Sequence, residues 1–323
     1  MNHGTDDSNS HPILSRFATL LAVTAILGFI ATCFASLHWV ADVMANARIQ
    51  LTLAALLATI ACLAVRQKRQ SILAFATVLA HVASMSGQLL GPMEKAQHGT
   101  SQIRLMTLNV LTRNEEHEAV VKEIESVDPD AFAVLEVNSV WINAIRRRLA
   151  ATYPHELVHP EERGNFGIAL FSKRPIQQPT TFKLNEEIHS LEVVIDGVRI
   201  IATHPLPPIG TRGFRSRNTH FDRLAERVAT KRRIAPSEPL VLMGDLNVTP
   251  WSPIFTRFAR NTELHRAKVG IDFQPTWYAF GSNLLTGLKL DHVLISDELS
   301  CEEARIGANV GSDHRSVSVQ LRY

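Results

Sequence analysis

Cysteine is scarce in this sequence, which has three among 323 residues. Cys33 and Cys62 fall in apolar segments, and Cys301 stands alone in the second half of the chain. Disulfide scaffolds and cysteine-based zinc sites both need clustered cysteines. The sequence therefore argues against both kinds of scaffold.

An excess of charge of one sign is also missing from the second part of the chain. Residues 99–323 hold equal numbers of basic and acidic residues, so their formal net charge is zero. Proteins that bind duplex DNA without sequence preference rely on clustered Lys and Arg to displace counterions. The balance of charge argues against a general nucleic-acid-binding domain. Binding of nucleic acid through a local basic groove is still compatible with it.

Charged residues of either sign are rare in residues 1–98, where apolar runs without acidic or basic residues cover 17–37, 49–65 and 71–93. A helix needs ~20 residues to cross the hydrocarbon of a bilayer. We therefore predict a membrane anchor with three transmembrane helices in residues 1–98 and a separate domain in residues 99–323. A cleaved signal peptide or a buried helical core explains the runs less well, because a signal peptide has a shorter apolar centre and a soluble helix shows a polar face.

The orientation of the anchor follows from Arg66, Lys68 and Arg69, which lie between the second and third runs. Basic residues in short loops stay on the cytoplasmic side. We expect a multi-pass protein of the inner membrane of a Gram-negative cell, with residues 99–323 on the periplasmic side. His81, inside the third run, is interpreted as a packing residue in preference to a functional one.

From residue 102 the pattern changes to short apolar or alternating runs bounded by turn residues. These runs predict strands, and helical patterns lie between some of them at about 115–126, 139–151 and 214–233. The mixed order favours an α/β domain with many antiparallel pairs over a repeating barrel. Residues 91–101 are polar and predict a short linker.

The sharpest local signal is MGDLNVTPWS at 243–252, which follows an apolar run ending at Leu242. Asp245 and Asn247 are expected on one side of the strand end, because alternate residues of a strand share a side. A carboxylate can accept a proton from water while an amide holds that water or a phosphoryl oxygen in place. Taken alone, the two residues also suit an ordinary turn.

A second signal consists of Asp291 in LDHVLIS and of Asp313 with His314 in GSDHRSV. Adjacent Asp and His side chains cannot both face one point from a regular strand, so we expect a loop at the rim of a site. Asp291 could then hold His314 protonated for contact with a phosphate oxygen and leave Asp313 for a metal ion. In isolation, Asp313 and His314 fit a loop salt bridge equally well.

Two further polar residues end apolar runs, namely Asn109 in TLNV and Glu136 in AFAVLEV. An unpaired polar group on a buried strand is costly, so both residues need partners. Mg²⁺ prefers oxygen ligands and usually takes one or two carboxylates. Glu136, Asp313 and Asn109 could supply these ligands, with Mn²⁺ as the alternative ion.

The ordered series TLNV, LEV, NFGIALFSKRP, ATHP, GDLN, LDHVLIS and SDHRSV resembles the endonuclease/exonuclease/phosphatase superfamily over residues 102–323. The resemblance implies a DNase-I-like, four-layer α/β/β/α sandwich with a metal site at its edge. It also implies the role of each residue in the site. Metal binding falls to Asn109, Glu136 and Asp313, water activation to Asp245, substrate orientation to Asn247, and phosphate stabilisation to Asp291 with His314.

His204 in ATHP matches the histidine of the DNase-I-like and sphingomyelinase-like branches of this superfamily. No carboxylate partner for it is evident, and a histidine before proline can simply end a strand. Leu135 stands where many members carry Gln. Arg215 and Asn218 are expected to contact substrate, although the basic cluster of Arg212, Arg215 and Arg217 suits bidentate phosphate contacts and a solvated face equally.

Together these residues predict a membrane-anchored, Mg²⁺-dependent phosphoesterase in which Asp245 activates water and His204 and His314 donate to phosphoryl oxygens. Phosphodiesters are favoured, and the substrate is either a nucleic acid or a phospholipid head group. A lipid substrate predicts an exposed apolar rim near the site, whereas DNA predicts a basic groove. Besides substrate, the expected partner is the lipid bilayer, with no obligate protein partner. The alternative is a catalytically silent domain that binds a phosphorylated ligand.

Overall fold

The structure is a computed structural model that describes residues 12–89, 99–185, 188–281 and 283–323. The chain divides into two compact units, Met1–Gly87 and Gln88–Tyr323. Most of the predicted linker at 91–101 and the end of the third predicted span lie outside the described residues.

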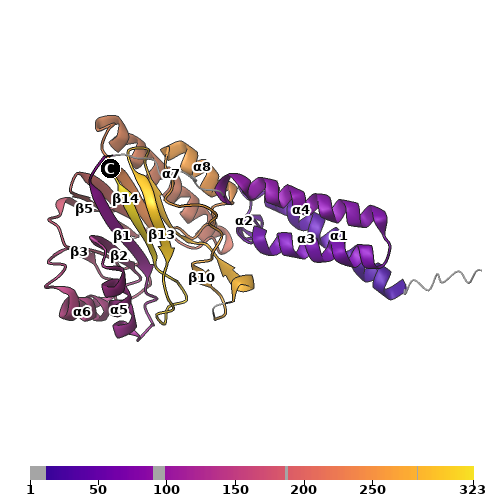
Figure 1. Cartoon of the computed structure of the whole chain (residues 1–323), viewed down its shortest axis with the longest axis horizontal. Coiled ribbons are helices and arrows are strands. Elements are labelled where there is room, and N and C mark those ends of the chain that lie inside the picture. The colour runs from indigo at the N-terminus through magenta and orange to yellow at the C-terminus, as the bar shows by residue number, and fades with distance from the viewer. Residues whose placement is uncertain (1–11, 90–98, 186–187, 282) are drawn as a thin grey trace, which may run out of the picture. The chain divides into compact units, whose positions relative to one another are not determined.

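The first unit is helical (Figure 1). Its helices are α1 (Pro12–Cys33), α2 (Trp39–Asn46), α3 (Arg48–Ala64) and α4 (Lys68–Leu89). Helices α1 and α4 are long and apolar enough to cross a membrane, whereas α2 and α3 qualify only if the pair, which is bent by 75°, counts as one span. The first and third predicted spans thus correspond to α1 and α4, and the second, at 49–65, corresponds to α3, which is long enough only together with α2.

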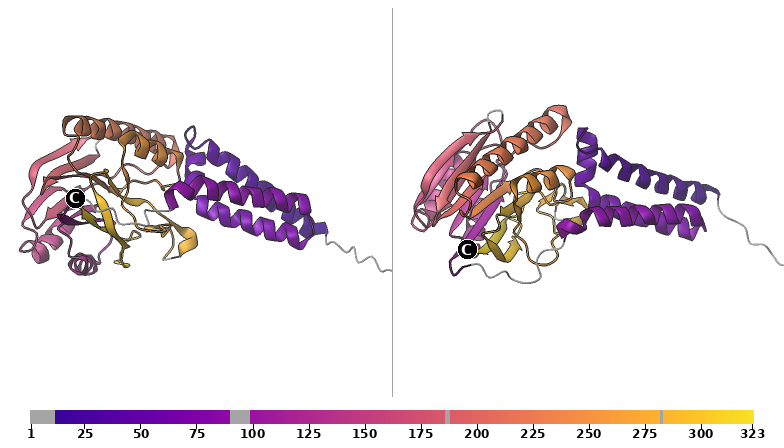
Figure 2. Two further views of the ribbon diagram at one scale, coloured as in Figure 1. Left: turned by 45° about the horizontal axis from the view of Figure 1, so that its top comes forward. Right: turned by 90° about the horizontal axis from the view of Figure 1, so that it is seen from above.

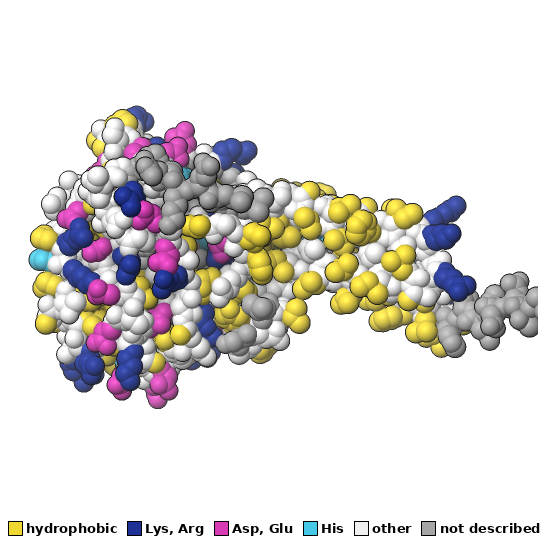
Figure 3. Space-filling model, viewed as in Figure 1, with side chains coloured by type: hydrophobic (Ala, Val, Ile, Leu, Met, Phe, Trp, Pro, Cys, Tyr) yellow, Lys and Arg dark blue, Asp and Glu magenta, His cyan; other side chains and the backbone are white. Residues whose placement is uncertain are grey.

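Small side chains lie where these helices pack together. The buried residues there include Ala18, Ala22, Ala55 and Ala58. Small side chains allow helix backbones to approach closely, as in many membrane bundles. Large apolar side chains such as Leu57 are exposed instead and cover the outside of the helices (Figure 3). This is a surface that lipid tails could cover.

The second unit contains two six-stranded sheets. The first has the order β13-β14-β1-β2-β4-β3, built from β1 (Gln102–Asn109), β2 (Ala131–Leu135), β3 (His155–His159), β4 (Ile168–Ser172), β13 (Ser300–Ile306) and β14 (Val317–Arg322). The second has the order β5-β6-β7-β8-β12-β9, built from β5 (Gln177–Lys183), β6 (His189–Ile195), β7 (Val198–Ala202), β8 (Leu240–Asp245), β9 (His265–Arg266) and β12 (Asp291–Ile295). The pairs β1/β2 and β7/β8 are parallel, and the other neighbours are antiparallel. The predicted mixed α/β fold is confirmed.

Helices cover the outer face of each sheet (Figures 1 and 2). Helices α5 (His117–Val127) and α6 (Ser139–Leu149) pack on the first sheet, and α7 (Gly210–Ile234) and α8 (Pro253–Thr262) pack on the second. Apolar side chains of the two inner faces form the core between the sheets. A short hairpin of β10 (Trp277–Tyr278) and β11 (Gly287–Leu288), with the 3-10 turn η1 (Leu284–Thr286) before β11, lies outside both sheets. The sequence predicted α5, α6 and α7. It did not predict α8, which begins at Pro253, a few residues after the GDLN motif.

Alternation along β1 decides which of its residues face the core between the sheets. Ile103 and Leu105 belong to that core, whereas Met106 and Leu108 pack with the helices on the outer face. Continuing this period of two places Asn109 on the inner side at the end of the strand. The inner layer therefore changes from apolar to polar at this end of the sandwich.

Candidate active site

Asp245 and Asp291 lie side by side where β8 ends and β12 begins. The strands are antiparallel, and their register pairs Asp245 directly with Asp291. Met243 and Val293, two residues along each strand, belong to the core between the sheets, so the alternation turns both carboxylates to the inner side. Asp245 and Asp291 are 2% and 0% exposed. Two buried carboxylates repel each other unless a cation lies between them.

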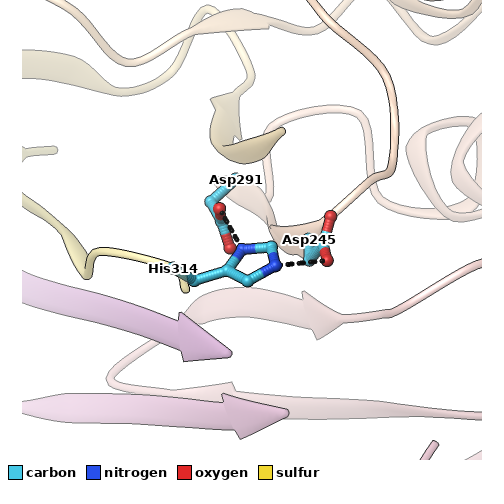
Figure 4. Close-up of side chains that lie close together, drawn as sticks. All are labelled: Asp245, Asp291 and His314. Carbon is cyan, nitrogen blue, oxygen red and sulfur yellow. Dashed lines mark hydrogen bonds and ion pairs between the residues drawn. The ribbon is translucent and has the colours of Figure 1, made fainter. Parts of the chain in front are cut away.

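His314 supplies that cation, and its ring lies between the two carboxylates (Figure 4). Its Nδ1 is 2.8 Å from Oδ2 of Asp291, and its Nε2 is 3.6 Å from Oδ2 of Asp245. Burial opposes the charge, but the two carboxylates outweigh burial and raise the pKa of His314 to about 10. His314 is therefore a buried, protonated donor at neutral pH, and the expected contact with Asp291 is present.

His204 approaches the same oxygen of Asp245. Its Nε2 lies 3.4 Å from Oδ2 of Asp245, and the ring of Phe166 packs against the imidazole with centroids 5.1 Å apart. Burial again opposes the charge, but the hydrogen bond and the charge of Asp245 raise the pKa of His204 above its ordinary value. No carboxylate partner for His204 is evident from the sequence, but the structure provides one in Asp245. The partner comes from β8, the parallel neighbour of the strand that precedes His204.

Three side-chain donors thus surround Oδ2 of Asp245, because Nδ2 of Asn109 also lies 3.2 Å from it. The backbone N–H of Asn247 donates to Oδ1 at 2.9 Å. Burial would raise the pKa of Asp245, but the charge of His314 and the hydrogen bond from His204 hold it well below its usual range. Asp245 is an ionised carboxylate held by a ring of donors.

Asn109 and Glu136 meet because β1 and β2 are parallel neighbours that end together, with Asn109 opposite Leu135. Nδ2 of Asn109 donates to Oε1 of Glu136 at 2.9 Å, and Oδ1 of Asn109 accepts from the N–H of Leu111 at 3.0 Å. The family resemblance implies that Asn109 binds a metal ion, and its amide oxygen would be the ligand atom. In the structure its nitrogen faces the carboxylates, so Asn109 orients Glu136.

Asn247 does not lie on the strand that carries Asp245. Strand β8 ends at Asp245, and Asn247 has a left-handed backbone with φ of 50°. Its Nδ2 donates to the carbonyl oxygen of Pro205 at 3.0 Å. The expectation that strand alternation places Asp245 and Asn247 on one side is therefore wrong, because a turn joins them.

Arg215 and Asn218, the two α7 residues that were expected to bind substrate, have different surroundings in the structure. Arg215 is exposed, and among the described residues no hydrogen bond or ion pair joins it to Asp245 or its partners. Arg217 is buried instead, and its guanidinium donates to the carbonyl oxygen of Asn247 at 3.3 Å and to Oδ1 of Asn218 at 2.8 Å. Asn218 is thus connected to the site through Arg217, for which phosphate binding and a solvated face were equally open from the sequence; the burial of Arg217 argues against the solvated face.

Asp313 precedes His314 in the loop before β14. Its Oδ2 accepts a hydrogen bond from Nε1 of Trp277 at 3.0 Å, whereas its Oδ1 is buried and has no hydrogen-bond partner in the described part of the chain. A buried carboxylate oxygen without a partner is unusual in a folded protein and is a suitable ligand for a hard cation. This atom fits the predicted metal-binding role of Asp313.

Another group of atoms could hold a metal ion, namely those of Asp245, Asp291 and His314, which lie within 4.8 Å of one another. Histidine binds metal ions as the neutral imidazole. Because the two carboxylates keep His314 protonated, we interpret this group as an ion-pair cluster.

Comparison with known proteins places this site in a family. Residues 106–314 match the model of the endonuclease/exonuclease/phosphatase family. The chain belongs to this family. No match was found among curated proteins.

Several solved structures have a similar fold. The 3′ phosphatase NExo from Neisseria, bound to a product DNA hairpin, has a TM-score of 0.58 and 18% identity, and the match covers 68% of this chain and 100% of that one. The human Nocturnin catalytic domain with bound sulfate has a TM-score of 0.55 and 19% identity, with 70% and 96% covered. Sphingomyelinase C from Streptomyces griseocarneus has a TM-score of 0.52 and 16% identity, with 68% and 99% covered. At these identities the likeness is one of fold.

Within this family member, the sequence spacing around Arg217 sets it apart from the other arginines of its cluster. Arg217 lies three residues after Phe214 and four before Phe221, and all three are buried. This spacing places Arg217 on the buried face of the helix, where a charged side chain needs a fixed partner. Trp277 and Phe166 carry no comparable signal, because their contacts with Asp313 and His204 depend on the tertiary fold.

Proposed function

We propose that this chain is a membrane-anchored phosphoesterase that uses a divalent metal ion, Mg²⁺ or Mn²⁺, to cleave phosphodiesters by attack of water. The supporting observation is that Asp245, buried and ionised, has the imidazole nitrogens of His204 and His314 at 3.4 and 3.6 Å from one oxygen. A carboxylate beside two imidazole donors is suited to activate water next to an anionic phosphate.

In this proposal His204 and His314 are the donors to the phosphoryl oxygens. An arriving phosphoryl group shares their protons with Asp245, because charge-assisted hydrogen bonds to phosphate are strong. Asp245 then receives less of the positive charge that now depresses its pKa. Its pKa rises toward a value useful for a general base. Asp291 keeps His314 charged and oriented during this exchange.

Glu136 and Asp313 would hold the metal ion. The support is the buried, unpartnered Oδ1 of Asp313 and the half-buried carboxylate of Glu136, which Asn109 orients. Two carboxylates with remaining water ligands suit Mg²⁺. When bound, such an ion neutralises charge that develops on the phosphate during hydrolysis.

An apolar rim near this site favours a phospholipid over a nucleic acid as substrate. Phe280 and Leu285, between β10 and β11, are 77% and 60% exposed. The base of their hairpin is bonded to Asp313, through Nε1 of Trp277 at 3.0 Å and the backbone N–H of Tyr278 at 2.9 Å. Exposed apolar side chains suit contact with lipid, whereas nucleic acid would require a basic groove.

The membrane location is part of the same proposal. Helices α1 and α4, with the broken pair α2 and α3, would anchor the chain in the inner membrane, and Arg66, Lys68 and Arg69 would hold their loop in the cytoplasm. The domain of residues 99–323 would then face the periplasm. Protease digestion of spheroplasts should cleave this domain while the membrane is intact. Cleavage only after lysis would reverse the orientation.

The full chain in detergent tests the activity. We expect Mg²⁺-dependent release of phosphate or head group from short-chain phospholipids, with slower or no cleavage of DNA and of a generic phosphomonoester. Asp245→Asn should abolish turnover and retain the fold, and Asp222→Asn, which changes a carboxylate 60% exposed on α7, is the matched control.

Three outcomes are decisive. Turnover retained by well-folded Asp245→Asn would eliminate Asp245 as the base. Faster cleavage of DNA than of lipid, with steep salt dependence, would make a nucleic acid the substrate. A wild-type chain that is inactive on every ester, with and without Mg²⁺, would favour a silent module that binds phosphorylated ligands.

A further inference from the structure

Trp277 lies at the base of the hairpin of β10 and β11, next to the loop that precedes β14. The backbone N–H of Tyr278 donates to the carbonyl oxygen of Asp313 at 2.9 Å, and Trp277 pairs with His314 in an antiparallel bridge. Both contacts are made by the main chain. The place of Trp277 beside Asp313 is therefore set by the backbone and does not depend on its side chain.

The indole of Trp277 contacts one carboxylate oxygen of Asp313. Its Nε1 donates to Oδ2 at 3.0 Å, and among the described residues this is the only hydrogen bond that the carboxylate accepts. The other oxygen, Oδ1, is buried and has no hydrogen-bond partner there. Trp277 thus makes the two oxygens of Asp313 different, because Oδ2 is occupied and Oδ1 is available to a ligand.

The donor that holds Oδ2 is neutral, and this affects what Oδ1 can bind. An indole donates one hydrogen bond and carries no charge. Arg or Lys at the same place would neutralise the carboxylate and repel a metal ion. Because Trp277 orients Asp313 without neutralising it, Oδ1 is suited to a hard cation.

A carboxylate with one occupied oxygen can offer a metal ion only the other one. Mg²⁺ requires near-octahedral geometry and takes few protein ligands, whereas Ca²⁺ takes more oxygens and often binds both oxygens of a carboxylate. The hydrogen bond from Trp277 to Oδ2 of Asp313 is therefore compatible with Mg²⁺ or Mn²⁺ and disfavours Ca²⁺.

We propose that Trp277 is a positioning residue that holds Asp313 as a ligand with one oxygen, and that it thereby makes the site select Mg²⁺ or Mn²⁺ over Ca²⁺. The inference rests on the proposed function, in which Asp313 and Glu136 hold the metal ion. Trp277 acts through Asp313 and does not touch the ion. Residues that donate hydrogen bonds to metal ligands commonly contribute about tenfold or more to metal affinity.

Binding of Mn²⁺ to the full chain in detergent, measured by electron paramagnetic resonance without substrate, tests the proposal. Trp277→Phe keeps an aromatic ring and removes the N–H, so the affinity for Mn²⁺ should fall about tenfold or more. Competition with Ca²⁺ gives the second readout. The ratio of Ca²⁺ affinity to Mn²⁺ affinity should rise, because Asp313 can then offer both oxygens, and a merely structural defect would weaken both ions alike.

Trp141→Phe is the matched control. Trp141 is a buried tryptophan of α6, and its Nε1 has no hydrogen-bond partner in the part of the chain that the structure describes. The same substitution therefore removes an N–H that holds no carboxylate, and both affinities should stay at the wild-type values.

The wild-type chain gives a test that does not depend on the folding of a variant. It should bind Mg²⁺ more tightly than Ca²⁺ in competition with Mn²⁺, and equal affinities for Mg²⁺ and Ca²⁺ would overturn the proposal. A folded Trp277→Phe chain with the wild-type affinities would overturn it too, and if Glu136→Gln weakened Mn²⁺ binding, the metal site of the proposed function would remain. Selective metal binding that depends on Trp277, in a chain that cleaves no ester, would instead support the proposal and contradict the proposed function.

Discussion

Asp245 and Asp291 are direct partners across the antiparallel pair of β8 and β12. Like charges in this position repel each other. The protonated ring of His314 contacts both carboxylates and compensates for the repulsion, so one imidazolium stabilises the strand pair and presents a donor to the site. The stability of this strand pair and the donor function of His314 therefore both depend on the protonated state of His314.

Replacement of Asp291 by Asn should expose this dependence in the pH profile. In the wild type the raised pKa, about 10, keeps His314 protonated throughout the neutral range. Without the Asp291 charge, burial lowers that pKa, so protonation is lost as pH rises. We expect kcat/KM to fall about a hundredfold or more at pH 8, the usual size of a proton-donor contribution, with partial recovery at acidic pH.

The measurement is kcat/KM against pH for Asp291→Asn beside Asp297→Asn, which changes an aspartate whose side chain is 82% exposed. The control should keep the wild-type profile. If Asp291→Asn loses activity equally at every pH, its effect is structural and the proposed charge pairing is incorrect.

Glu136→Gln tests the metal assignment. The variant keeps the volume and the contact with Asn109 but removes a charged ligand, so the Mg²⁺ concentration for half-maximal activity should rise about tenfold or more. Chelation should abolish wild-type activity, and excess Mg²⁺ should restore it. Glu161→Gln, a half-buried acid after β3, serves as the control. An unchanged Mg²⁺ requirement in Glu136→Gln would move the metal ion away from this carboxylate.

The sequence predicted which residues end the strands at the site, but not which of these residues contact one another. Apolar runs ending in Asn109 and Asp245 were recognisable, because a buried strand that ends in a polar side chain is a local pattern. The pairing of Asp245 with Asp291 was not, because it depends on the register of two strands distant in sequence. For the same reason the sequence did not identify Asp245 as the partner of His204.

Local conformation limited the prediction in two other places. Asn247 adopts a left-handed backbone, so the strand alternation assumed for it stops at Asp245. The amide of Asn109 can present either oxygen or nitrogen, and its neighbours in the fold decide which, namely the N–H of Leu111 on one side and the carboxylates of Glu136 and Asp245 on the other. Neither choice is encoded in residue type or spacing.

Glu192, on β6, should be a major determinant of the stability of the fold. Its side chain is 1% exposed and bridges Arg199, Arg227 and Lys231. Glu192→Gln leaves these cations around a neutral amide, so we expect a loss of about 3 kcal/mol or more in unfolding free energy. Glu118→Gln, in an exposed pair with Lys122, should cost less than about 0.5 kcal/mol.

The pH dependence of this loss gives a second readout. Burial would raise the pKa of Glu192, but the hydrogen bond from Lys231 and the charge of Arg227 lower it below 4.5. A lowered pKa stabilises the fold above pH 4.5 and ceases to do so as pH falls through the folded-state value. The difference in Tm between wild type and Glu192→Gln should therefore be constant near neutral pH and shrink below pH 4.5. A constant difference at all pH values would show that the ion pairs do not cause it.

Gly244 determines how closely His204 can approach Asp245. Its φ is +144°, and a Cβ built there would lie 2.0 Å from the carbonyl oxygen of Thr203, the residue before His204. The backbone N–H of Thr203 donates to the carbonyl oxygen of Met243 at 3.1 Å, so the two segments are in direct contact beside Gly244. Any side chain at position 244 must push them apart.

Gly244→Ala should therefore reduce both stability and activity. We expect a loss of about 2 kcal/mol or more from strain and the displaced backbone, and a fall of about a hundredfold in kcat, because His204 moves away from Oδ2 of Asp245. Gly197→Ala is the matched control, since Gly197 has φ of +79° but nothing within 4 Å of a built Cβ. It should lose stability through backbone strain and keep its kcat. Thermal unfolding and kcat measured on both variants separate the two effects, and a Gly244→Ala enzyme with normal kcat would show that the approach of His204 to Asp245 is dispensable for turnover.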